Sequence, residues 1–268
     1  MARYKQRARE LKQDAFRDAT VSLFERLGDW IAARRRTVIY AVGAIVILVL
    51  VVGLWGWWSA RRADEAQKAL GEAIRIAQAP IGDVPAGYAG PKFANRRERA
   101  QRAAEEFQKV AARYGEPYRD KARYLAAVNL LEVDRARGLG ELEALSKSGN
   151  DEIAAWAKFA LAQAREADGQ LDAALALYRE LADARNPIIP PDDAKLRIAE
   201  ILYKQGKRQE ASDLLFRMVE AARTARDRNG KPIAQSDAVR AAAERLQAID
   251  PDRYAQLPPE PPVEFPVF

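Results

Sequence analysis

The sequence predicts an all-α protein with an amphipathic N-terminal helix, one transmembrane helix and a stack of short helix pairs. Three observations lead to this prediction. Residues 37–58 carry no charged side chain, apolar residues recur at steps of three and four through most of the rest of the chain, and one pattern of small residues and glycine occurs twice, 37 residues apart. No segment alternates convincingly between apolar and polar residues, as a half-buried strand does.

Residues 1–36 form a basic tail with ten Lys or Arg residues and five acidic ones. Its apolar residues recur at helical spacing, which predicts one amphipathic helix. Three placements fit this helix: the membrane surface, the surface of a partner protein, or solvent. The apolar stripe consists of Leu11, Ala15, Phe16, Ala19, Leu23, Phe24, Leu27, Trp30 and Ile31.

The uncharged run of residues 37–58 is long enough to cross a bilayer. As a helix its 22 residues span about 33 Å, close to the thickness of the hydrocarbon layer. It exceeds the apolar core of a signal peptide and precedes no good cleavage site, so we expect it to be retained. A core helix of a soluble domain is the alternative. The expected membrane-interface anchors are Trp30, Arg34, Arg35, Arg36, Trp55, Trp57, Trp58, Arg61 and Arg62.

The distribution of charge predicts the orientation and argues against a nucleic-acid partner. The tail holds ten basic residues, whereas the first 20 residues after the run hold four: Arg61, Arg62, Lys68 and Arg75. We therefore expect a single-pass protein of the bacterial inner membrane, with a cytoplasmic N-terminus, an extracytoplasmic C-terminal domain and membrane lipid as a partner. Of the net charge of +6, the tail carries +5, so the domain is nearly neutral and has no basic groove for nucleic acid.

The residue types present do not indicate an enzyme. The chain has no cysteine and no histidine, which removes the usual general base, the usual metal ligands and thiol nucleophiles. Phosphate-binding, dinucleotide-binding and serine-hydrolase motifs are also missing from the sequence. The paired acids Glu105/Glu106 and Asp192/Asp193 fit solvated helix faces or caps. We expect no catalytic residue, no cofactor and no metal.

Residues 59–250 form the predicted helical domain. A helix follows directly from the membrane run, which favours a rigid stalk, and a Pro/Gly-rich loop occupies residues 79–95. Helical patterns then cover about 95–114, 118–137, 140–148, 151–167, 170–184, 191–205, 208–228 and 236–249. Residues 251–268 contain six prolines and predict an extended tail. Its Phe265 and Phe268 dock either on the domain or on a partner.

Two of the helix pairs share a pattern. Ala162, Gly169 and Ala174 in the first pair have counterparts Ala199, Gly206 and Ala211 in the second, each 37 residues later. This pattern resembles the tetratricopeptide repeat, in which small residues let two helices approach closely and a glycine makes the turn between them. The resemblance implies an α-solenoid of tetratricopeptide-like helix pairs. Ala126, 36 residues before Ala162, marks a more degenerate unit without a turn glycine.

The whole layout, with a basic tail, one span, a continuing helix and irregular repeats, resembles the YfgM-like family of ancillary translocon subunits. The resemblance covers roughly residues 20–225 and implies membrane or periplasmic protein partners, among them the translocon. We expect a membrane-anchored interaction scaffold, ancillary to protein translocation or envelope protein assembly. The alternative is a structural accessory subunit of a large membrane complex. The expected lining of a partner-binding groove is Phe159, Gln163, Glu166, Leu196, Glu200 and Tyr203.

Overall fold

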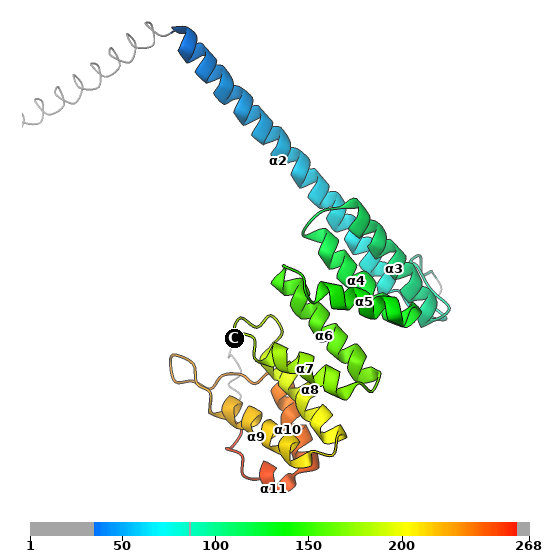
Figure 1. Ribbon diagram of the computed structural model, residues 1–268, viewed down its shortest axis with the longest axis vertical. Helices are drawn as coiled ribbons and strands as arrows, with labels where there is room; N and C mark the ends of the chain where they lie inside the picture. The colour runs from blue at the N-terminus through cyan, green and yellow to red at the C-terminus, as the bar shows by residue number, and fades with distance from the viewer. Residues whose placement is uncertain (1–34, 86, 262–268) are drawn as a thin grey trace, which may run out of the picture. The chain divides into compact units, whose positions relative to one another are not determined.

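The computed structural model describes residues 35–85 and 87–261 (Figure 1). Within these residues the protein is all-helical, with ten helices, no strand and two isolated β-bridges. The predicted all-α class is therefore confirmed for this part of the chain. The chain divides into two compact units, one up to Glu65 and one from Ala66 onward, and each is described by itself. The predicted amphipathic helix of the tail lies outside the described residues.

Helix α2 (Arg35–Ala77) is 43 residues long and continues past the uncharged run, as the sequence predicts. It contains an 18-residue window apolar enough to cross a membrane, and none of that window is buried. The large apolar side chains between Val46 and Trp58 are 50–69% exposed. A core helix buries side chains of this kind, so the described part of the chain does not support the core-helix alternative.

The second unit is a succession of helices in which each contacts the next in sequence (Figure 1). Three further contacts skip one helix: between α4 and α6, between α8 and α10, and between α9 and α11. The helices after α2 are α3 (Arg96–Arg113), α4 (Tyr118–Val133), α5 (Arg135–Leu145), α6 (Asp151–Ala167), α7 (Leu171–Ala182), α8 (Pro191–Lys204), α9 (Arg208–Thr224), α10 (Asp237–Ile249) and α11 (Pro251–Tyr254).

Side-chain caps fix where several helices begin. The Asn95 amide oxygen accepts from the Glu98 backbone N–H at 2.9 Å, and the Glu98 carboxylate accepts from the Ala94 N–H at 3.0 Å. Asn150 and Ser236 cap α6 and α10 in the same way, accepting from the backbone two to three residues ahead. Each cap satisfies an N–H that has no partner inside the helix, so these boundaries follow from local sequence.

The two repeated glycines end α6 and α8 with the same turn. Gly169 and Gly206 have φ of +75° and +79°, in the left-handed region that glycine enters without a steric penalty. After α6, the Gln170 N–H donates to the Arg165 carbonyl at 2.9 Å, and the Lys207 N–H makes the equivalent bond to Leu202 at 2.9 Å. These bonds close a Schellman motif at each helix end, which reverses the chain into the second helix of the pair.

The core of the second unit consists of three clusters. One joins Leu70 and Ala73 of α2 to Phe107 of α3 and to α4. A second joins α4, α5 and the first turns of α6. The largest lies among α6 to α10 and includes the repeated alanines Ala174 and Ala211, both fully buried. Small buried residues at these positions are what the repeat pattern predicts for the second helix of each pair.

The boundary between α4 and α5 differs from the predicted one. The sequence predicts helix over 118–137, whereas α4 ends at Val133 and Asp134 caps α5 by accepting from the Arg137 N–H at 3.1 Å. This cap replaces the missing turn glycine. Gly138 lies inside α5, where an added Cβ would be 2.8 Å from the Leu131 backbone nitrogen. The glycine of this pair therefore serves close packing rather than the turn.

The segment after residue 250 also differs from the prediction of an extended tail, because Pro251–Tyr254 forms one turn of helix. Asp250 caps it by accepting from the Arg253 N–H at 3.2 Å, and proline is favourable at the first helical position. The following residues lie against the domain, where Arg223 donates to the Pro258 carbonyl at 2.7 Å. Phe265 and Phe268 lie outside the described residues.

Candidate partner-binding surface

The six residues of the expected lining lie on α6 and α8, the first helices of the two repeated pairs. Phe159, Gln163 and Glu166 on α6 correspond to the three on α8 after a shift of 37 residues, Leu196, Glu200 and Tyr203. Gln163 and Tyr203 are exposed, and the other four side chains are half-buried. They therefore form an amphipathic surface rather than a solvated one.

Two lining residues of α6 contact the second helix of their own pair. The Phe159 ring meets the ring of buried Tyr178 edge-on, with 5.7 Å between centroids. The Tyr178 hydroxyl donates to the Glu166 carboxylate at 3.3 Å, and burial together with this carboxylate raises the pKa of Tyr178. Glu166 also accepts from Lys204 of α8 at 2.6 Å. This ion pair joins α6 to α8.

The lining residues of α8 have partners as well. Arg197 donates to Glu200 at 2.9 Å within the helix. The guanidinium carbon of Arg245, on α10, lies 4.6 Å from the centroid of the Tyr203 ring. The lining residues of α6 and α8 form a row of first helices, and this cation–π contact extends the row to α10. Sequence reasoning did not include Arg245, because 42 positions separate it from Tyr203.

An aromatic group on α4 and α6, which sequence reasoning also missed, continues the same row. Trp156 lies three residues before Phe159 on α6 and packs against Tyr124 of α4 with 5.8 Å between ring centroids. The Lys121 ammonium lies 5.4 Å from the Trp156 ring. Burial raises the pKa of Tyr124. The helical spacing of Trp156 and Phe159 is the sequence signal that places both on one face.

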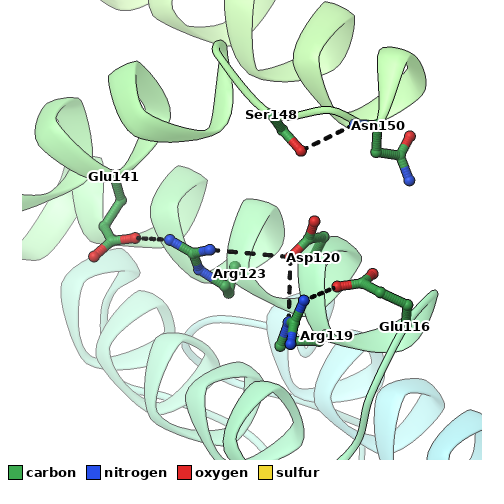
Figure 2. A network of polar contacts seen from close by, with 7 residues as sticks. All are labelled: Glu116, Arg119, Asp120, Arg123, Glu141, Ser148 and Asn150. Carbon is green, nitrogen blue, oxygen red and sulfur yellow. Dashed lines mark hydrogen bonds and ion pairs between the residues drawn. The ribbon is translucent and has the colours of Figure 1, made fainter.

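Charged residues of α4, of the turn before it and of α5 form a polar network (Figure 2). Arg119 pairs with Glu116 at 2.5 Å and with Asp120 at 3.5 Å. Arg123 reaches Asp120 at 3.9 Å and Glu141 of α5 at 3.2 Å. Three acids share two arginines in this network, so it ties α4 to α5 and keeps a net negative charge.

Two of the cavities in the second unit are lined by residues other than the six of the expected lining. The larger, about 400 Å³, lies between α8 and α9, and the smaller, about 210 Å³, lies between α2 and α3. The larger is lined by Asp192, Lys195, Leu214, Arg217, Met218, Ala221 and Ala222. The six lining residues lie outside both of these cavities, and a surface of this kind suits contacts spread along a polypeptide.

No group of three or more acidic side chains in the described residues is arranged to hold a metal ion. Asp193 is half-buried near the start of α8, and burial together with the neighbouring Asp192 raises the pKa of its carboxyl. The expectation that the protein has no cofactor and no catalytic residue stays a prediction.

The membrane-interface anchors fall partly within the described residues. Trp55, Trp57 and Trp58 are exposed, and the guanidinium groups of Arg61 and Arg62 lie 5.7 and 4.7 Å from the Trp57 and Trp58 rings. Each pair is four residues apart, one turn of the helix. Arg36 is also exposed. Trp30 and Arg34 lie outside the described residues, and Arg35 is described only as the first residue of α2.

Comparison of the chain with family models, with curated proteins and with solved structures finds no match. Its resemblance to the YfgM-like family thus stays a prediction from architecture and repeat motifs.

Proposed function

We propose that the protein is a single-pass membrane scaffold whose helical domain captures protein partners outside the cytoplasm, ancillary to protein translocation or envelope protein assembly. The long exposed apolar stretch of α2 supports the anchor. Eleven large apolar side chains from Val46 to Trp58 are exposed. Exposing apolar surface to water costs about 25 cal/mol per Å², and burial of these side chains in a bilayer removes that cost. The stacked Trp–Arg pairs at residues 57–62 suit a headgroup region, where aromatic rings and basic side chains both concentrate.

A tetratricopeptide-like solenoid is supported by the way the helices contact one another. Each helix contacts the next, and first helices also contact first helices, as α4 does α6 and α8 does α10. The matched Schellman turns at Gly169 and Gly206 and the matched buried alanines support the same repeat. In such an array the first helices line one continuous surface.

The observation that carries the scaffold proposal is the amphipathic row formed by those first helices. It combines half-buried aromatic and aliphatic side chains, Trp156, Phe159 and Leu196, with exposed Gln163 and Tyr203. An extended polypeptide offers the complementary mixture of side chains and backbone hydrogen bonds. Enzymatic chemistry has no comparable support on this surface, which lacks histidine and cysteine.

A structural accessory subunit is the second candidate, and one observation favours it. Several charges of the row are already satisfied inside the chain, through the Glu166–Lys204 and Arg197–Glu200 pairs. Paired charges stabilise the stacking of the helices and contribute less to capture of a partner. In this reading, α2 and the tail hold the protein in a larger complex and the helical domain covers it.

Photocrosslinking in cells tests the proposal. A photoreactive residue replaces Gln163 on the row, Trp55 in the apolar stretch of α2, or, as a control on another face, Lys147, which is exposed on the turn after α5. Mass spectrometry identifies what each position captures. The scaffold proposal predicts several protein partners at Gln163 that elute from the full chain in salt.

The accessory-subunit candidate predicts a different pattern, in which Trp55 captures one protein stoichiometrically and Gln163 captures none. That pattern would overturn the scaffold proposal. Equal capture at Gln163 and Lys147 would also count against it, because it would show that the row has no preference for partners.

A further inference from the structure

Arg245 holds its charge on an aromatic ring, as Lys121 does on Trp156, and among the described residues neither cation has a carboxylate partner. The central carbon of the Arg245 guanidinium is 4.6 Å from the centroid of Tyr203, whose side chain is 37% exposed. Within the described residues Arg245 forms no ion pair and donates no hydrogen bond. The two charged pairs nearest in sequence to Tyr203, Glu166–Lys204 and Arg197–Glu200, are each balanced.

The acids that could compensate Arg245 from nearby elements are directed elsewhere. Glu166 and Glu200 are bonded to Lys204 and Arg197. Asp193 lies ten residues before Tyr203 on α8, which is about 15 Å along the helix. Glu244 precedes Arg245 on α10 and projects about 100° away around that helix. The row therefore carries an uncompensated positive charge at this point.

The nitrogen atoms of the Arg245 guanidinium differ in their burial. Its Nε is buried and has no hydrogen-bond partner, so this edge faces the protein. The two terminal nitrogens also have no hydrogen-bond partner among the described residues, and they are not among the buried atoms. A planar guanidinium held on a ring presents its two terminal N–H donors in a fixed fork, which matches the two oxygens of a carboxylate.

The row around this fork suits a polypeptide better than a lone anion. Half-buried Phe159 on α6 has its counterpart in half-buried Leu196 on α8, and exposed Gln163 lies one turn after Phe159. An extended segment contacts such positions with alternate side chains, so its affinity is spread along its length and one acidic side chain sets its register.

We propose that Arg245, on its Tyr203 platform, binds the carboxylate of an Asp or Glu side chain in the extended segments captured by the row of first helices. The inference deepens the proposed function and rests on it. It means that the protein recognises acidic segments, and it distinguishes Arg245 from Arg240, the other arginine of α10.

The test is a selection from a display library of random 12-residue peptides against the full chain in lipid nanodiscs. Selected peptides are then measured by fluorescence anisotropy against the parent, Arg245→Gln, Arg245→Lys and the control Arg240→Gln. Arg240 lies on the same helix and pairs locally with Asp237. We expect enrichment of Asp and Glu, about tenfold weaker binding to Arg245→Gln, an intermediate loss for Arg245→Lys and no change for Arg240→Gln.

The outcomes separate this inference from the proposed function. Peptides that bind the row without acidic enrichment, or that bind Arg245→Gln as well as the parent, overturn the inference and leave the scaffold proposal in place. A parent that selects no peptide, or selects peptides that crosslink away from Gln163, contradicts both. Should Arg245→Gln unfold, Tyr203→Leu replaces it, because loss of the platform alone is expected to weaken binding about two- to fivefold.

Discussion

Substituting alanine for glycine is expected to change the stability of the domain for a different physical reason at each of three positions. Together these three variants test the structure of the helices and their pairs. Gly206 has φ +79° and nothing within 4 Å of an added Cβ, so alanine there costs only the left-handed backbone, about 1–2 kcal/mol. Gly138 has an ordinary helical backbone, but its Cβ would lie 2.8 Å from the Leu131 nitrogen and 3.0 Å from the Ala127 oxygen. Neither backbone atom moves easily, so α4 and α5 must separate, at about 1–3 kcal/mol.

At Gly71 the same substitution is expected to raise stability. This glycine is exposed in α2, an added Cβ would meet nothing within 4 Å, and its φ is not positive. Alanine there removes flexibility from the unfolded chain and is expected to stabilise the helix by about 0.5–1 kcal/mol. The expected order of stability is therefore Gly71→Ala above the parent, and Gly206→Ala and Gly138→Ala below it.

The assay uses a fragment of residues 59–268, which we expect to be soluble, monomeric or weakly dimeric, and helical by circular dichroism. Trp156 is its only tryptophan and is half-buried, so fluorescence and circular dichroism follow unfolding independently. For a chain of this size a loss of 1–2 kcal/mol lowers Tm by about 2–8 °C. A Gly206→Ala variant as stable as the parent would refute the left-handed turn, and an unchanged Gly138→Ala would refute the close approach of α4 and α5.

Three further predictions concern packing, pH and topology. Ala174→Leu should overpack the crossing of α6 and α7 and lower the free energy of unfolding by about 1–3 kcal/mol, whereas Gln163→Leu on the row should leave Tm near the parent's. Because the pKa of Tyr178 is raised in the folded state, the unfolded chain loses this proton at lower pH than the folded chain does. The free energy of unfolding should therefore be steady below about pH 10 and fall above it, and it should fall less steeply in Tyr178→Phe. Identical alkaline profiles for the parent and this variant would contradict the prediction. A protease added to intact spheroplasts should remove the domain and spare roughly the first 36 residues; protection of the domain instead would reverse the orientation.

The parts of this fold that the sequence predicts are those governed by neighbouring residues. Asn150 and Ser236 cap helices within three residues of themselves, and Gly169 and Gly206 make turns that depend only on local backbone angles. The repeated alanine at position 174 follows from the same spacing. For this reason the helix ranges from α6 to α10 agree closely with the predicted ones.

The parts that the sequence does not predict depend on contacts between distant residues. The stacking of Arg245 on Tyr203 joins two helices, and no local pattern pairs them. Pro258 is bound by Arg223, 35 residues earlier, which draws a proline-rich segment onto the domain. The end of α4 at Val133 was also mispredicted, because the apolar spacing continues through Asp134 and only the cap geometry breaks it.

Helix α6 contributes residues to two of the three core clusters and also to the proposed binding surface. Ala157 and Leu161 of α6 belong to the cluster with α4 and α5, whereas Ala162 belongs to the larger cluster that extends to α10. In an array where each unit contacts only its neighbours, stability is close to a sum of neighbouring interfaces, so α6, together with Leu177 of α7, which packs against both, couples the two clusters. The same helix carries Phe159 and Gln163 on the proposed binding surface. On the scaffold proposal, a segment bound there is expected to hold α6 in its packed position and, by binding the folded state alone, to stabilise both clusters together.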